Sequence, residues 1–258
     1  MTAPPLAAVG LDPATPTSSV GGSTGRLWRV DTAEGPYALR LTPQPGELAA
    51  MAAARSAGLP VPEVLNQAST DDGTALLLTW LSGIPVAEAI RRNPASAAAL
   101  GETVGAAQRR LHDVPAPAGV PRPNRWMTPP DAPPPPAGEQ LLHLDWHWLN
   151  ILVDGTKITA ILDWENARRG PAVLDLARTH ALLTVEPSLA ALSATEREVT
   201  QRFAAAWAAG YGPAATAIPP WAHHWAGRTM LADRGPSFAD RPAALDGLRA
   251  WTAAWRRD

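Results

Sequence analysis

The chain has 258 residues, enough for one large domain or for two lobes that share a cleft. It contains no cysteine, which excludes disulfide bridges, thiolate zinc sites and a cysteine nucleophile. The formal charge of -2 argues against a nucleic-acid or membrane partner, and no apolar run approaches the roughly 20 residues of a spanning helix, so we expect a soluble, cytoplasmic protein.

The first predicted elements are two strands that form a hairpin. Residues 26–30 and 37–41 have strand-like composition, and the turn between them passes through Glu34-Gly35-Pro36. A glycine-rich turn at residues 21–25 precedes the first strand. On its own, such a glycine cluster is typical of an ordinary hairpin turn.

A helix, a strand and a second helix are predicted next. The alanine-rich run at residues 47–57 favours a helix, which stops at Gly58-Leu59-Pro60. A strand is predicted at residues 75–80 and a longer helix at about residues 95–112. The dense prolines of residues 114–136 then prevent regular structure, so this segment is either the rim or lid of a cleft or an exposed connector.

The last third of the chain has a helical pattern. Its aromatic residues recur at a spacing of four: Phe203, Trp207 and Tyr211; Trp221 and Trp225; and Trp251 and Trp255. Such spacing predicts the buried faces of helices rather than contacts with a cofactor. A small strand-rich part followed by a larger helical part predicts an α+β fold with two lobes.

The centre of the chain contains a second predicted hairpin. Its apolar strands at residues 151–153 and 157–162 are joined by Asp154-Gly155, a strong turn signal. A hairpin brings its outer ends together, and Asn150 and Asp163 flank the two strands at roughly 10 Å from the pairing point. We therefore expect both side chains to face one cleft.

Asp145 precedes Asn150 on a loop, so two carboxylates and a carboxamide are expected to converge from three points of the sequence. Oxygen ligands of this kind suit Mg²⁺, which is usually held by one or two carboxylates together with substrate phosphates. A nucleotide would complete the coordination. The sequence therefore predicts a site for magnesium and a nucleotide at this end of the hairpin.

The segment from His143 to Asp163 resembles the catalytic and metal-binding loops of the aminoglycoside phosphotransferase family, small-molecule kinases with a protein-kinase-like fold. The resemblance lies in the pattern His-x-Asp-x-x-x-x-Asn followed by Ile-x-Asp-Trp. It implies that Asp145 orients the acceptor hydroxyl and accepts its proton, while Asn150 and Asp163 hold the metal ions. It also implies a bracing role for His143.

The resemblance covers most of the chain and extends to the nucleotide. It places a phosphate-covering loop at the glycine-rich turn, with backbone N–H groups that would bind phosphate oxygens at Gly22, Ser23, Thr24 and Gly25. Arg40 stands in the place of a strand lysine that pairs with the phosphates, and Glu47 would be its ion-pair partner. Arginine keeps the charge of lysine but changes the geometry of the contact.

The same resemblance divides the chain into a nucleotide-binding lobe, residues 1–82, and a lobe with the catalytic loop, the metal-binding hairpin and acceptor-binding helices, residues 83–258. Trp80 and Leu81 would belong to the hinge, where backbone groups bind the purine edge. Asp175 would be a carboxylate that braces a loop.

The function implied is Mg²⁺-dependent transfer of the γ-phosphate of ATP or GTP to a hydroxyl of a small molecule, such as an aminoglycoside, a sugar or an amino alcohol. Two alternatives stay open. Arg40 also fits a catalytically inactive nucleotide-binding protein of the same fold, and His143-x-Asp145-x-His147 also fits a zinc hydrolase. No sequence feature indicates an obligate protein partner.

Overall fold

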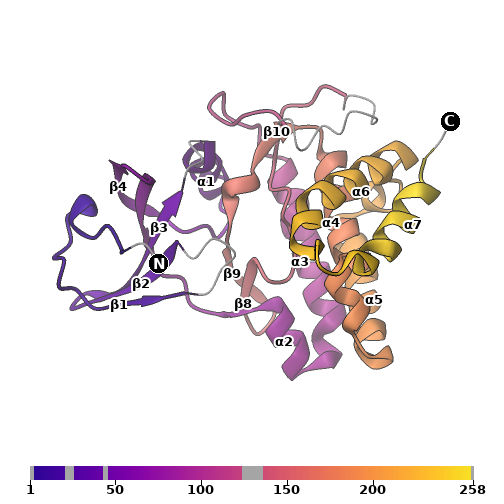
Figure 1. The fold of residues 1–258 in the computed structure, drawn as a ribbon, viewed down its shortest axis with the longest axis horizontal. Helices are drawn as coiled ribbons and strands as arrows, with labels where there is room; N and C mark the ends of the chain where they lie inside the picture. Colours follow the sequence, from indigo (N-terminus) through magenta and orange to yellow (C-terminus); the bar gives the residue numbers. More distant parts are fainter. Residues whose placement is uncertain (1–2, 21–25, 43–45, 124–135, 257–258) are drawn as a thin grey trace.

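The computed structural model describes residues 3–20, 26–42, 46–123 and 136–256 (Figure 1). A strand-rich N-terminal lobe lies beside a larger helical C-terminal lobe, which confirms the predicted α+β fold. Within the described residues, no helix combines the length and the apolar character needed to cross a bilayer.

An antiparallel sheet forms the centre of the N-terminal lobe. Its strands follow the spatial order β1-β2-β3-β5-β4. Their bounds are β1 (Thr17–Ser19), β2 (Leu27–Thr32), β3 (Gly35–Thr42), β4 (Val64–Thr70) and β5 (Gly73–Thr79), and helix α1 (Gly46–Ser56) follows β3. The predicted hairpin, helix and strand are confirmed, whereas β4 was not predicted because most of its residues are polar and exposed.

The two faces of this sheet belong to different apolar clusters. Leu39 and Leu41 of β3 face a small cluster that includes Val9 of the short 3₁₀ helix η1 (Ala7–Val9). Arg40 lies between these two leucines in the strand, so its side chain projects from the opposite face. That face looks toward α1 and the C-terminal lobe, because Ala38 packs against the main core there.

The chain enters the C-terminal lobe through residues 80–83 and then pairs with the central hairpin. Strand β6 (Ile84–Pro85) pairs with β8 (Ile151–Asp154), which pairs in turn with β9 (Lys157–Ile161), as the sequence predicted for the hairpin. Gly83 has a φ of 129°, and a Cβ there would lie 2.4 Å from Thr159 Oγ1. Glycine thus lets the interlobe connection pass close against the hairpin.

Six helices dominate the described part of the C-terminal lobe. They are α2 (Val86–Arg92), α3 (Ala97–His112), α4 (Ala172–Thr184), α5 (Ala194–Tyr211), α6 (Pro220–Arg234) and α7 (Asp246–Ala254). Helix α3 packs on α5, α4 packs on α6, and α6 packs on α7 (Figure 1). Short 3₁₀ helices connect them: η2 (Pro94–Ser96), η5 (Pro187–Ala191), η6 (Pro213–Ala215), η7 (Gly235–Phe238) and η8 (Pro242–Leu245).

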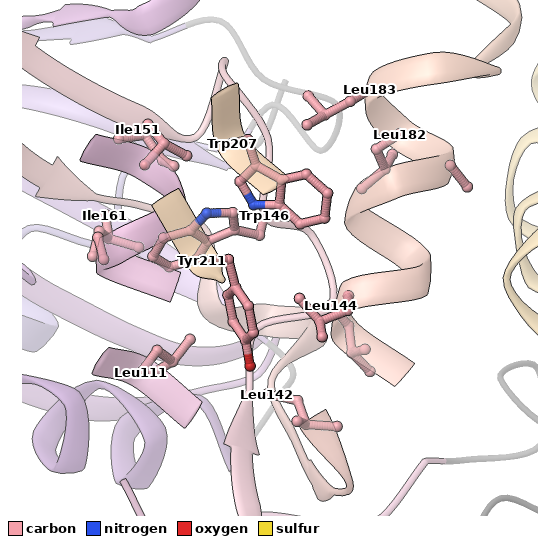
Figure 2. Packing of buried hydrophobic residues seen from close by; sticks show 14 of the residues in the cluster. Leu111, Leu142, Leu144, Trp146, Ile151, Ile161, Leu182, Leu183, Trp207 and Tyr211 are labelled. Atoms are coloured by element: carbon pink, nitrogen blue, oxygen red, sulfur yellow. The ribbon is translucent and has the colours of Figure 1, made fainter. Parts of the chain in front are cut away.

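One apolar core fills the C-terminal lobe and continues to α1. Figure 2 shows Trp146 and Trp207 in its middle, with Ile151 and Ile161 of the hairpin on one side and α4 on the other. The predicted aromatic stripes are buried at Phe203, Trp207, Tyr211 and Trp225, but Trp221, Trp251 and Trp255 are only half-buried. Because Trp146 directly follows Asp145, the buried indole anchors the loop that carries this carboxylate.

The described part of the proline-rich segment is packed between the two lobes. Val120 is buried, and a Cβ on Gly46 of α1 would lie 2.5 Å from Pro121 Cδ. On the other side, Arg169 N donates to Pro121 O at 2.8 Å. Residues 114–123 therefore contact both lobes, although several of them are exposed, and the segment's central part, residues 124–135, lies outside the described residues.

Candidate active site

A buried carboxylate fixes the backbone at the start of the loop that carries Asp145. Asp175 of α4 is fully buried, and its oxygens accept hydrogen bonds from His143 N at 2.9 Å and from Leu144 N at 2.8 Å. Leu144 has a φ of 60°, which costs a non-glycine residue about 1 to 3 kcal/mol. These bonds hold the strained residue in place, and the bracing role expected for Asp175 agrees with them.

Asn150 contacts Asp145 directly. Its Nδ2 donates to Asp145 Oδ2 at 2.9 Å and to Asp145 O at 3.0 Å. Two acceptors at one end of the amide fix its orientation, so Oδ1 points the other way. No residue of the described chain donates a hydrogen bond to this oxygen, which leaves it available for a ligand.

The Asp145 carboxylate stays ionised although it is only 20% exposed. Burial raises its pKa, but the hydrogen bond and charge of His147, with the charges of Arg178 and His143, outweigh burial and hold the pKa at about 2. His147 Nε2 lies 3.5 Å from Asp145 Oδ1. A carboxylate with so low a pKa is a weak base that can still accept a hydrogen bond from a hydroxyl.

Arg40 reaches across to the hairpin and is surrounded by carboxylates. Its Nη1 lies 3.1 Å from Glu47 Oε1, which is the expected ion pair. Its Nη2 lies 2.8 Å from Asp163 Oδ1 and 3.2 Å from Glu165 Oε2. Glu165, in the 3₁₀ helix η4 (Trp164–Asn166), was missed by the sequence analysis; its position two residues after Asp163 was the available signal.

This group carries more negative than positive charge. Burial raises the pKa of Glu47 and of Glu165, and Arg40 opposes the rise in both without cancelling it. Burial lowers the pKa of Arg40, but Glu47 and Asp163 outweigh burial and raise it, so the guanidinium is charged. One positive charge among three acidic groups leaves an excess of negative charge, which a bound cation would neutralise.

Hydrogen bonds tie the loop to the end of the hairpin. Leu162 N donates to Asn150 O at 2.8 Å, and His143 Nε2 bonds Leu162 O at 2.9 Å. Asp163 follows directly, with a left-handed φ of 61°. The structure thus brings Asp145 into contact with Asn150, and Asp163 directly follows the residue whose N–H bonds to the backbone of Asn150.

The residues present fit a magnesium ion. Asn150 offers a free amide oxygen, and Asp163 is 34% exposed with a carboxylate beside a surplus of negative charge. Among the residues that the structure describes, no three or more His, Cys, Asp or Glu side chains could hold a metal ion by themselves. The expected magnesium ligands are instead an amide oxygen, a carboxylate and the phosphate oxygens of a nucleotide.

The zinc alternative is not supported by the geometry of His143. Its imidazole is fully buried, with Nε2 bonded to Leu162 O and Nδ1 accepting from Asp145 N at 3.3 Å. Both ring nitrogens are therefore used, so His143 has none left for a metal ion.

The residues expected to contact the nucleotide are only partly described. Gly22, Ser23, Thr24 and Gly25 lie outside the described residues. Trp80 and Leu81 lie in the connection between β5 and β6, and both are half-buried. The Arg29 guanidinium carbon lies 4.9 Å from the centre of the Trp80 ring, a cation–π contact that holds the indole against the sheet.

The sequence matches the model of a family described as "Phosphotransferase enzyme family" over residues 19–137 and 129–224. A search of curated proteins gives no match.

Solved structures of several kinases are similar to this chain. A thermostable mutant of aminoglycoside phosphotransferase APH(4)-Ia, in a ternary complex with AMP-PNP and hygromycin B, is 17% identical, with 93% of each chain covered and a TM-score of 0.60. Aminoglycoside-3'-phosphotransferase of type VIII is 15% identical over 86% of this chain and 94% of that chain, with a TM-score of 0.57. A choline/ethanolamine kinase family protein from Mesorhizobium loti is 19% identical over 94% and 86%, with a TM-score of 0.54. These likenesses confirm the predicted kinase-like two-lobe fold.

Proposed function

Because the chain belongs to the phosphotransferase enzyme family, we propose that it transfers the γ-phosphate of ATP or GTP to a hydroxyl of a small molecule. The observation that carries this proposal is the contact between Asp145 and Asn150, which orients the amide oxygen of Asn150 away from the carboxylate. The ternary complex of the similar APH(4)-Ia with AMP-PNP and hygromycin B supports a nucleotide and a small acceptor as the two substrates.

Asp145 would position the acceptor. Its ionised carboxylate accepts the hydrogen bond of the attacking hydroxyl and so aligns that oxygen with the phosphorus atom. A loose phosphoryl-transfer transition state needs little proton removal before the new bond forms, so a base with a pKa of about 2 is sufficient to orient the hydroxyl and take its proton late.

Asn150 and Asp163 would hold Mg²⁺, which when bound neutralises charge on the phosphates. Arg40 would contribute a fixed positive charge toward the phosphates, and its pairing with buried Glu47 keeps the guanidinium at the end of β3. The amides of the loop at residues 21–25 would bind phosphate oxygens as well.

We assign nucleotide binding to residues 1–82 and acceptor binding to residues 83–258. Trp80 and Leu81 precede the boundary and connect the N-terminal sheet with β6 and the central hairpin. The hinge is thereby attached to the element that carries Asn150 and Asp163, so closure of the lobes would bring both sets of residues to one nucleotide.

An inactive nucleotide-binding protein of the same fold is the second candidate, because Arg40 replaces lysine. Turnover of MgATP and MgGTP with a library of hydroxyl compounds, followed as release of the nucleoside diphosphate, distinguishes the two. We expect acceptor-dependent release. Nucleotide binding without release for any acceptor would support the inactive protein instead.

Asp145→Asn tests the catalytic assignment. We expect a loss of about 1000-fold in kcat, since a positioned general base contributes roughly 100- to 10,000-fold. The nucleotide dissociation constant, measured by calorimetry, should change less than about threefold, because Asp145 contacts the acceptor. Near-normal turnover in this variant would remove Asp145 from the proposed role.

A further inference from the structure

A cavity of about 280 Å³ lies beside the start of α4, separate from the residues assigned above. Its described wall is apolar apart from two arginines: three prolines, Ala137 and Leu174 form most of the lining, and Arg122 and Arg169 complete it. No carboxylate belongs to the described lining. The cavity therefore offers positive charge beside an apolar surface, which suits an anionic group on a hydrocarbon body.

The exposed carboxylate of Glu139 contacts both guanidinium groups. Arg122 Nη2 donates to Glu139 Oε1 at 2.5 Å, and Arg169 Nη1 lies 3.4 Å from Glu139 Oε2. Two positive charges thus share one negative charge. In addition, Nε of Arg169 is buried and has no hydrogen-bond partner among the described residues. An anion in the cavity would neutralise the remaining charge.

Close packing keeps this wall in place. A Cβ on Gly138 would lie 2.2 Å from Pro171 N, so only glycine lets the chain before β7 (Gln140–Leu142) approach the junction of β10 (Arg168–Gly170) and α4 this closely. Arg122 Nη1 also donates to Gly138 O at 3.2 Å. Arg169 therefore lies on a closely packed strand, and the Arg122 side chain is bonded to the segment packed beside it.

The cavity is within reach of Asp145. Arg169 lies opposite Leu141 in the β7–β10 pair, and Leu141 precedes Asp145 by four residues. At the strand rise of about 3.3 Å per residue, the backbone of Leu141 lies at most about 13 Å from that of Asp145. On the α4 side, Leu174 directly precedes Asp175, whose carboxylate holds the backbone of the loop. The cavity wall is thus connected to the Asp145 loop on two sides, through β7 and through α4.

We propose that this cavity anchors the acceptor, and that the acceptor is a small hydroxyl compound that carries a carboxylate or phosphate group on an apolar body. The inference rests on the proposed function, because it takes the ligand to be the molecule that is phosphorylated. The two guanidinium groups would repel a polycationic acceptor and attract an organic anion.

The direct test is binding of a matched acid and amide. We would titrate the full-length protein with 3-(hydroxymethyl)benzoate, with 3-(hydroxymethyl)benzamide and with inorganic phosphate by calorimetry. We expect the benzoate to bind at least about 10-fold more tightly than the benzamide. Arg169→Gln and Arg122→Gln should each bring this ratio toward one and weaken phosphate binding.

Arg55→Gln is the matched control. Arg55 also pairs with a glutamate, Glu63, at 2.6 Å and also lines a cavity, but that cavity lies in the N-terminal lobe and includes the carboxylate of Glu63. The acid-to-amide ratio should be unchanged in this variant. Thermal denaturation checks that all three variants are folded. If Arg169→Gln does not fold, the acid-to-amide ratio of Arg122→Gln alone tests the inference.

Three results would overturn the inference: equal binding of acid and amide, a preference for the acid that persists in both arginine variants, or no binding of either the benzoate or phosphate. Turnover separates it from the proposed function. If no hydroxyl compound, acidic or neutral, yields a nucleoside diphosphate, the proposed function fails while arginine-dependent anion binding still stands. If neutral compounds are phosphorylated with the same kcat/KM as their acids, the function stands and the anchoring role is wrong.

Discussion

Arg40 links the two lobes through the geometry of its guanidinium group. Nη1 faces Glu47 of α1, and Nη2 faces Asp163 and Glu165 beyond the hairpin. The two Nη atoms of an arginine can bond carboxylates on both sides at once, whereas the single ammonium group of a lysine could reach only one side. The departure from lysine is thus matched by an extra carboxylate, Glu165, in the same contact.

Removal of the arginine should destabilise the fold. Arg40→Met leaves Glu47, whose side chain is 1% exposed, without its partner, and we expect a loss of about 3 kcal/mol in the free energy of unfolding. Urea denaturation measures this. Adding Glu47→Gln in the same chain should recover part of the loss, because the unpaired charge is gone; equal stability of the single and double variants would contradict the argument.

Helices α3 and α5 lie closer together than side chains of ordinary size allow. A Cβ on Gly105 of α3 would lie 2.0 Å from Trp207 O, and one on Gly101 would lie 2.5 Å from Phe203 O. The sequence pattern predicted both helices, but it gave no sign that these glycines mark their contact. That contact sets the position of Trp207 in the core beneath the Asp145 loop.

Gly105→Ala should therefore destabilise the protein, although alanine favours helices. We expect a loss of about 3 kcal/mol, because the added methyl group meets backbone rather than a movable side chain. The control is Gly247→Ala in α7, where a Cβ meets nothing within 4 Å and helix propensity should give a gain of up to about 1 kcal/mol. Changes of the same sign in the two denaturation curves would contradict this account.

A cluster of histidine and tryptophan rings joins α4, α6 and α7. His223 of α6 stacks on Trp255 with ring centres 4.3 Å apart, and it meets His180 of α4 at 4.9 Å. Nδ1 of each histidine is buried and has no partner among the described residues. Burial, with a smaller contribution from the charge of His180, lowers the pKa of His223 to about 4.

The cluster predicts loss of stability in acid. An unfolded histidine titrates near 6.5, so between about pH 6.5 and pH 4 the unfolded chain binds a proton that His223 in the folded chain does not. Stability should fall by about 3 kcal/mol as the pH is lowered through this window. His223→Phe should make Tm less dependent on pH there. The neighbouring His224→Phe should retain the dependence; if both variants behave alike, His223 is not its source.

At the scale of the whole molecule, the sequence predicted the secondary-structure elements that depend on residues close together in the chain. The hairpins and the helices at α1, α3 and α5 follow from periodicity and from turn residues such as Asp154-Gly155. Strand β4 and helix α2 were missed because the strand is polar and the helix is short. The resemblance, more than the pattern, supplied the kinase-like arrangement.

Long-range contacts explain the rest of the difference. The pairing of Arg40 with Glu165 joins residues far apart in the chain, and the bonds of Asp175 to the Asp145 loop depend on how α4 packs. Neither of these contacts produces a periodic pattern in the sequence from which it could be predicted. The cavity lined by Arg122 and Arg169 likewise arises only when β7 and β10 pair.

The most direct test of the whole account is a crystal structure with Mn²⁺ and AMP-PNP, in which anomalous scattering locates the metal. We predict a manganese peak bonded to Asn150 Oδ1, to the Asp163 carboxylate and to phosphate oxygens, with Asp145 facing the γ-phosphate. A bound nucleotide with no metal at Asn150 and Asp163, or a metal held by other residues, would contradict the assignment on which the proposed function depends.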